Sequence, residues 1–92
     1  MEEKEIEERA KKVVSSILGV DEEKIKSESR FVEDLGAESV ASLELVAGFE
    51  EEFDIEMDEN AALEVKTFGD SVKFIKKYIE AKWTFLYLIV AV

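Results

Sequence analysis

The sequence predicts an all-α protein, a small four-helix bundle of three longer helices and one short helix, with a long loop between helices 1 and 2. Apolar residues recur at steps of three and four, which is the spacing of one face of a helix. Residues that typically start or stop helices flank those stretches. No convincing strand pattern accompanies them, and 92 residues suit one domain.

The first helix is expected from Glu3 to Leu18. It should stop at Gly19, because glycine commonly ends helices. Its apolar face is formed by Ile6, Ala10, Val13, Val14 and Ile17. Asp21 is placed to cap the short turn DEEKI that follows.

The long loop runs from there to Glu38 without sustained periodicity. A loop of about twenty residues in a small domain is usually functional or disordered. Spaced apolar residues argue for an ordered loop, and these anchors are Val20, Ile25, Phe31, Val32 and Leu35.

The second helix is expected from Ser39 to Phe53, with two distinct faces. At about 100° per residue, one broad arc forms the core face. Its members are Leu43, Leu45, Val46, Phe49 and Phe53. The opposite stripe mixes small apolar groups with carboxylates, at Val40, Glu44, Ala47 and Glu51.

The last helices follow an acidic connection that contains Ile55 and Met57. A short helix is expected from Glu59 to Leu63, after which Val65 should fill the core. Thr67 and Asp70 form a variant of the capping box that opens the last helix. The core face of that helix is formed by Phe68, Val72, Ile75 and Ile79.

The C-terminal tail, Trp83–Val92, differs from the predicted domain at residues 1–82, because WTFLYLIVAV carries no charge. Crossing a bilayer takes about 20 apolar residues, so this segment is too short to span one alone. Three interpretations remain open: a helix extension packed on the domain or a partner, a membrane-surface contact, or a non-native end. Its composition is also typical of strands that aggregate.

Composition excludes several classes of function. Cysteine is absent, which rules out disulfides and fits a reducing compartment, and histidine is absent, so no serine hydrolase triad can be assembled. A formal net charge of −11 argues against nucleic acid binding and favours basic partner proteins. The charged start MEEKEIEERAKK lacks the apolar core of a signal peptide, so a cytoplasmic location is expected.

The central motif is FVEDLGAESVASLELV, from Phe31 to Val46. It breaks at Gly36 and places Ser39 at a loop-to-helix junction. Unpaired N–H groups and the positive end of the helix dipole favour an attached phosphate there. Helix capping by Ser39 is the competing interpretation, although Ser42 stands where a capping box needs Glu or Gln.

Negative charge surrounds this serine. From residue 31 through residue 65 the chain contains no lysine or arginine. Its acidic residues there are Glu33, Asp34, Glu38, Glu44, Glu50, Glu51, Glu52, Asp54, Glu56, Asp58, Glu59 and Glu64. This segregation suggests a surface that steers basic enzyme patches, while a solubilising shell is the alternative.

The segments FVEDLGAESV, LELV and EEEFDIE resemble the acyl carrier proteins of fatty acid and polyketide synthesis, whose hallmark is a loop of the form DLGADSL. The resemblance covers Ile6 to Ala81. It implies that Ser39 carries 4′-phosphopantetheine and that acyl intermediates are held there as thioesters by a protein that is no enzyme. The implied partners are a phosphopantetheinyl transferase and basic surfaces of acyl-processing enzymes such as ketoacyl synthases and acyltransferases.

Two residues depart from the family motif. The family usually has aspartate before the serine, where it helps to hold the transferase's magnesium ion, and Glu38 keeps the charge with one more methylene. Val40 replaces a leucine that the family inserts into partner enzymes. By resemblance, the positions that face partners are Val40, Glu44, Ala47, Glu50 and Glu51.

An acyl pocket between the helices is also implied by the resemblance. Its expected lining is Leu45, Val46, Phe49, Val65 and Ile75. The size of the side chains at Ala47, Phe49 and Val65 is expected to limit chain length.

Other classes remain as alternatives. The main one is an unmodified acidic interaction module with the same fold, which binds a basic partner without cargo. A self-contained enzyme is disfavoured because GAESV differs from the GxSxG elbow. Asp54, Glu56 and Asp58 alternate as in a calcium loop, but glycine and glutamate are missing at its sixth and twelfth positions, so no metal site is predicted.

Overall fold

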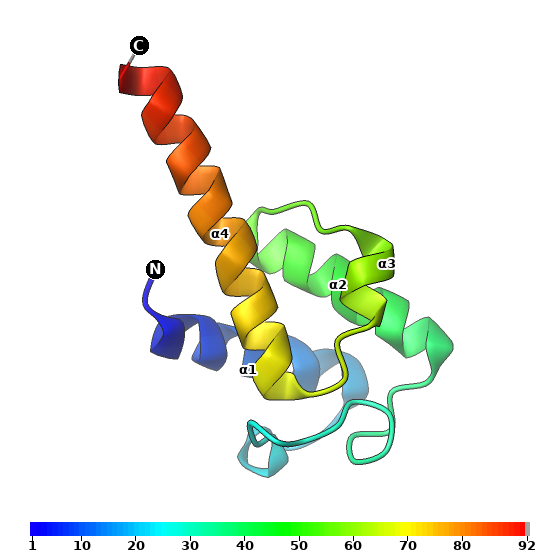
Figure 1. Ribbon diagram of the computed structural model, residues 1–92. Helices are drawn as coiled ribbons and strands as arrows, with labels where there is room; N and C mark the ends of the chain where they lie inside the picture. The colour runs from blue at the N-terminus through cyan, green and yellow to red at the C-terminus, as the bar shows by residue number, and fades with distance from the viewer. Residues whose placement is uncertain (92) are drawn as a thin grey trace.

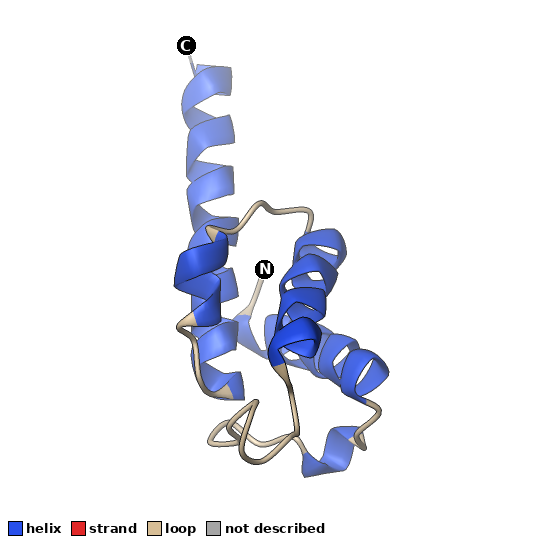
Figure 2. Ribbon diagram, turned by 90° about the vertical axis from the view of Figure 1, so that its right-hand side faces the viewer, coloured by secondary structure: helices blue, strands red, loops and turns tan. Residues whose placement is uncertain are grey.

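Helices enclose one hydrophobic core in the computed structural model (Figure 1), which describes the backbone of residues 1–91 and the side chains of residues 1–82. The elements are α1 (Glu3–Leu18), the 3-10 turn η1 (Glu22–Lys24), α2 (Ser39–Phe53), α3 (Glu59–Leu63) and α4 (Phe68–Ala91). Over residues 1–91 there is no strand, and Figure 2 shows only helices and loops. The predicted all-α fold with three longer helices and one short helix is confirmed.

The ends of the helices follow from local hydrogen bonds. Gly19 ends α1 with a φ of 68°, a left-handed conformation that glycine adopts without strain, and its N–H donates to Ser15 O at 2.9 Å. The Asp21 carboxylate accepts the Glu23 N–H at 3.3 Å at the start of η1. At the start of α4 the Thr67 hydroxyl accepts the Asp70 N–H at 3.2 Å. These three predicted signals are confirmed.

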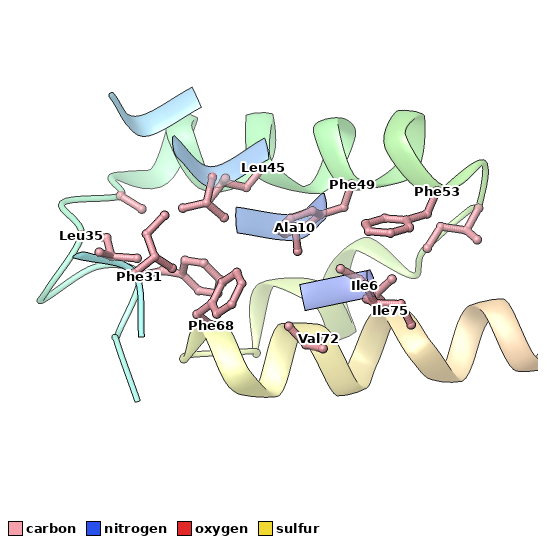
Figure 3. Close-up of a cluster of buried hydrophobic side chains, with 14 of the residues drawn as sticks. Ile6, Ala10, Phe31, Leu35, Leu45, Phe49, Phe53, Phe68, Val72 and Ile75 are labelled. Atoms are coloured by element: carbon pink, nitrogen blue, oxygen red, sulfur yellow. The ribbon is translucent and has the colours of Figure 1, made fainter. Parts of the chain in front are cut away.

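The core lies where α1, α2 and α4 meet. Figure 3 shows Phe49 and Phe53 on α2 facing Ile6 and Ala10 of α1, with Ile75 of α4 completing the layer. The long loop adds further apolar side chains to this core, and its buried members are Ile25, Phe31, Leu35 and Ala37. The loop is therefore packed and ordered, as its anchors predicted.

Two predictions are wrong: Leu43 does not belong to the core face of α2, and Val32 is not a buried anchor of the long loop. Leu43 is 45% exposed and Val32 is 56% exposed. On α2 the buried residues Leu45, Phe49 and Phe53 follow steps of four, and Leu43 lies about 120° of helix rotation away from Phe49. The core face of α2 is therefore narrower than the predicted apolar arc.

The long loop is joined to the start of α4 by main-chain hydrogen bonds. The N–H groups of Phe31, Phe68 and Gly69 donate to Lys66 O, Ser29 O and Ser27 O at 3.0, 2.9 and 2.8 Å. We call these three bonds the loop clamp. They hold the segment that leads to Ser39 against the α3–α4 connection.

The last helix extends farther than the core requires. Its last buried residue among those described is Ile79, while the helix runs to Ala91. Figures 1 and 2 both show its C-terminal turns projecting beyond the other helices. Over the residues searched, no helix is both long enough and apolar enough to cross a membrane.

Gly69→Ala tests the loop clamp. A methyl group at this position would lie 2.8 Å from the Ser27 carbonyl oxygen, which is backbone and cannot rotate away. We expect the free energy of unfolding to fall by about 1 to 3 kcal/mol, as for other overpacked sites, measured by urea denaturation. The control is Lys73→Ala, an exposed position on the same helix, which should change stability by less than about 0.5 kcal/mol.

Candidate functional site

Ser39 is the first residue of α2 and its side chain is exposed. Its hydroxyl makes no hydrogen bond with any residue whose side chain is described. Glu38 occupies the N-cap position in an extended conformation, with φ −82° and ψ 175°, and makes no side-chain cap. The interpretation of Ser39 as a helix cap is therefore wrong, and its hydroxyl is open to an incoming reagent.

The backbone around Ser39 suits a phosphate. The Ser42 N–H donates to Glu38 O at 2.8 Å, which is the first hydrogen bond of the helical ladder. The N–H groups of residues 39 to 41 precede that bond and have no acceptor within the helix. Together with the helix dipole they favour a negatively charged group on the Ser39 oxygen. The residues present thus fit a phosphate-linked prosthetic group.

The loop before Ser39 is held by its own hydrogen bonds. The Ala37 N–H donates to Phe31 O at 2.8 Å, and the side chain of Ala37 is fully buried. Between them Gly36 adopts a φ of 72°, which lets the chain reverse toward α2. The buried side chains of Phe31, Leu35 and Ala37 therefore fix the backbone two residues before the serine.

An ion pair strengthens the same turn. The Asp34 carboxylate accepts the Arg30 backbone N–H at 2.8 Å and the guanidinium Nε at 3.2 Å. The side-chain hydrogen bond from Arg30, followed by its backbone hydrogen bond, lowers the pKa of Asp34 below its ordinary value. The sequence analysis predicted Asp34 only as part of the acidic surface and not as an ion-pair partner, although Arg30 and Asp34 are four residues apart.

The stripe of α2 opposite the core face is exposed at all four predicted positions, Val40, Glu44, Ala47 and Glu51, and we call it the exposed stripe. Val40 is 69% exposed, so its apolar side chain is open to solvent at the start of the helix. Among the described side chains, neither Glu44 nor Glu51 forms an ion pair. This face therefore presents an apolar side chain beside uncompensated negative charge.

Glu50 lies elsewhere than expected. It is half-buried, and its carboxylate accepts the Met57 N–H at 2.9 Å. Glu50 thereby holds the connection between α2 and α3 in place. We therefore leave it out of the exposed stripe, because its carboxylate already has a structural partner.

A cavity of about 170 Å³ opens between α2, α3 and α4. Four predicted pocket residues line it: Leu45, Val46, Phe49 and Val65. Ile75 does not, because it is fully buried in the core facing α1, and its neighbour Phe74 lines the cavity instead. Ala47 is exposed and also lies outside the lining.

Several lining residues were missed from the sequence. They are Phe31, Val32, Glu33, Ser42, Met57, Ala62, Leu63, Lys66, Ser71 and Phe74. Phe74 lies about 100° from Ile75 on the helical wheel. An aromatic residue beside the core face was therefore the sequence signal that could have indicated a lining position, and the structure shows Phe74 half-buried. The contribution of α3 depends on how that short helix packs, which no local pattern shows.

Two of the three alternating acids after α2, Asp54 and Asp58, have structural roles. The Asp54 carboxylate lies 2.8 Å from Lys82 Nζ, and the Asp58 carboxylate accepts the Asn60 N–H at 3.0 Å to cap α3. Within the described residues, no three carboxylates converge as ligands of a metal ion would.

A small helical bundle with an exposed serine at a helix N-terminus is the arrangement expected of a carrier domain. Residues 8–75 match the family model of the phosphopantetheine attachment site. The match covers most of the chain, so the protein belongs to this family, whose cofactor is a covalently attached 4′-phosphopantetheine.

Arg30→Ala tests the ion pair. The backbone hydrogen bond to Asp34 remains but the larger side-chain contribution is lost, so the pKa of Asp34 should rise part of the way toward its ordinary value. Folding depresses this pKa, so the pair stabilises the fold at neutral pH and stops doing so as pH falls through the folded-state pKa. The stability difference between the two proteins should shrink over the same range.

NMR titration of the side-chain carboxyl carbons measures the pKa of Asp34 and that of a control residue in one experiment. Asp54 is the internal control, because its pKa is lowered by Lys82 and not by Arg30. Asp54 should titrate identically in both proteins. An unchanged Asp34 titration in the variant would show that the guanidinium does not act on it.

Proposed function

We propose that this protein is an acyl carrier protein whose attachment residue is Ser39, and that it serves fatty acid or polyketide synthesis. The single observation that carries the proposal is the exposed hydroxyl of Ser39 at the start of α2, which is bonded to none of the side chains described in residues 1–82. It lies inside the range that matches the phosphopantetheine attachment site.

The attachment reaction is a phosphoryl transfer. The Ser39 oxygen attacks the β-phosphorus of coenzyme A and forms a phosphodiester bond. The pyrophosphate bond of coenzyme A breaks, and 3′,5′-ADP is the leaving group. The hydroxyl proton needs a base, and the chain has no histidine to supply one. The base and the metal ion therefore come from a phosphopantetheinyl transferase.

The prosthetic group supplies a terminal thiol that holds acyl groups as thioesters. The protein's part is to hold the phosphate at the start of α2 and to leave the cargo alone. With neither cysteine nor histidine, no thiol or imidazole of its own can intercept the thioester. Family members are typically carriers without catalysis of their own, and we assign this protein the same role.

Glu38 precedes the attachment residue and is exposed. We assign it the contact with the transferase's magnesium ion, which its carboxylate can reach without breaking a bond of its own fold. No described side chain pairs with it, so turning toward the metal would cost little.

The exposed stripe of α2 is the proposed docking face for basic surfaces of acyl-processing enzymes. Val40 offers an apolar contact, and Glu44 and Glu51 offer charges that form no ion pair with the side chains of residues 1–82. Complementary charge raises association rates and makes binding weaken with salt.

The 170 Å³ cavity is the proposed shelter for the acyl chain. Leu45, Val46, Phe49 and Val65 line it with apolar groups, while Phe74 takes the place expected for Ile75. Phe74 stacks edge to face on Tyr78, with ring centroids 5.1 Å apart, so its position is supported by a neighbour. We therefore assign the limit on chain length to Phe49, Val65 and Phe74, and no longer to Ala47.

Ser39→Ala tests the attachment site. After incubation with a broad-specificity transferase and coenzyme A, intact-mass spectrometry should show one phosphopantetheinyl group on the unmodified sequence. The variant should show none, because the attacking oxygen is gone. Ser42→Ala, one helical turn later, is the matched control and should accept the group.

Two results would contradict the assignment. Addition of the group to Ser39→Ala would place the attachment elsewhere. No addition to the unmodified sequence by any transferase, with retained salt-sensitive binding to a basic protein, would favour the unmodified interaction module.

Glu44→Lys tests the docking face. Reversing this charge should weaken binding to a basic acyl-processing enzyme by about two- to tenfold at low salt, and the difference should narrow as salt rises. Glu8→Lys changes the net charge equally on exposed α1 and should have a smaller effect. Surface plasmon resonance across a salt series measures both, and equal losses would indicate that net charge alone matters.

A further inference from the structure

The C-terminal part of α4 lies outside the bundle. Ala81 and Lys82 are exposed, and the helix continues from there to Ala91 (Figure 1). The longest dimension of the molecule is 47 Å against 25 and 19 Å for the others. Neither the core nor the proposed carrier site needs these turns.

The segment 83–92 has no charged residue. Successive residues of a helix are rotated by about 100°, so the nine helical residues from 83 to 91 cover every side of it. Only Thr84 and the polar tips of Trp83 and Tyr87 interrupt the apolar sequence. A helix that is apolar on all sides must be buried by its surroundings.

The surroundings can be inferred from that all-round apolar character. A pair of helices buries only the stripe that faces the partner, and the outer half of each then carries polar residues. This segment offers no polar half. Lipid acyl chains surround a helix from every side, so we propose that residues 83–92 insert into one leaflet of a lipid bilayer.

The length agrees with this proposal. The nine residues from 83 to 91 are helical and extend about 13.5 Å, a little less than half of the roughly 30 Å hydrocarbon core. The segment therefore reaches through one leaflet without crossing the bilayer. Trp83 and Tyr87 are residues that membrane interfaces favour.

The base of the segment is marked by charge. Lys82 Nζ lies 2.8 Å from the Asp54 carboxylate and 2.7 Å from Asp54 O. This ion pair belongs to the bundle and is costly to desolvate. Insertion therefore stops between Lys82 and Trp83.

The kind of lipid follows from the charge of the rest of the protein. A formal net charge of −11 repels an anionic membrane. The uncharged segment does not depend on lipid charge. Zwitterionic phosphatidylcholine is therefore the expected surface, and anionic lipid should weaken binding at low salt.

The orientation leaves the opposite end of the protein in water. In Figure 1 the N-terminal end of α2 lies at the right-hand edge of the bundle, on the side opposite the projecting C-terminal turns of α4. A carrier held in this way would present its attachment end to enzymes in solution. This consequence depends on the proposed function, but the membrane contact does not.

Flotation with phosphatidylcholine vesicles tests the proposal on the full chain. The protein should float with the vesicles, and replacing a third of the lipid by phosphatidylglycerol should reduce the bound fraction at low salt. Leu88→Glu places a charge inside the leaflet and should weaken binding by about tenfold or more. Ser16→Glu adds the same charge on exposed α1 and should bind within about twofold of the original sequence.

Trp83 is the only tryptophan, so its fluorescence reports on the start of the segment without a label. Its emission should shift to the blue when vesicles are added, and the shift should be lost in Leu88→Glu. Circular dichroism of that variant checks that the bundle remains folded.

Three outcomes would overturn the proposal. Absence of flotation and of the blue shift would exclude insertion. Binding that requires anionic lipid and survives Leu88→Glu would place the contact on lysines instead. A dimer in lipid-free buffer that Leu88→Glu converts to a monomer, without vesicle binding by the original sequence, would show that a second copy covers the segment.

Discussion

The loop clamp is the constraint on which the carrier site depends. The residues between η1 and α2 form no regular element, yet their backbone groups need partners when buried. Phe31, Phe68 and Gly69 donate their N–H groups to Lys66, Ser29 and Ser27 in turn, so each segment satisfies the other. With the loop fixed in this way, the first residue of α2 has a definite position.

The same arrangement separates the buried core from the exposed face of α2. One face of α2 buries Leu45, Phe49 and Phe53, and the opposite face leaves Val40 and Glu44 exposed. Burial of the first set provides the hydrophobic stabilisation of the bundle. The exposed residues contribute little to the stability of the bundle, so they can be used for recognition. One helix can therefore both build the core and present a surface.

Local charge has different uses at different positions. Asp34 and Asp54 each pair with a cation of the protein, and Glu50 binds a main-chain N–H group. Glu44 and Glu51 have no such partner among the described side chains. Some of the acidic residues behind the formal net charge of −11 therefore have structural roles, and others have no partner among the described side chains.

The sequence by itself determined the helices, because apolar spacing, Gly19, Asp21 and Thr67 act through bonds within a few residues. It also determined the motif around Ser39, and the family match over residues 8–75 agrees with that reading. Tertiary structure decided that Leu43 and Val32 are exposed, that Phe74 lines the cavity in place of Ile75, and that Glu50 is engaged with Met57. Those outcomes depend on how separate helices pack and on contacts between distant segments, which local periodicity does not contain.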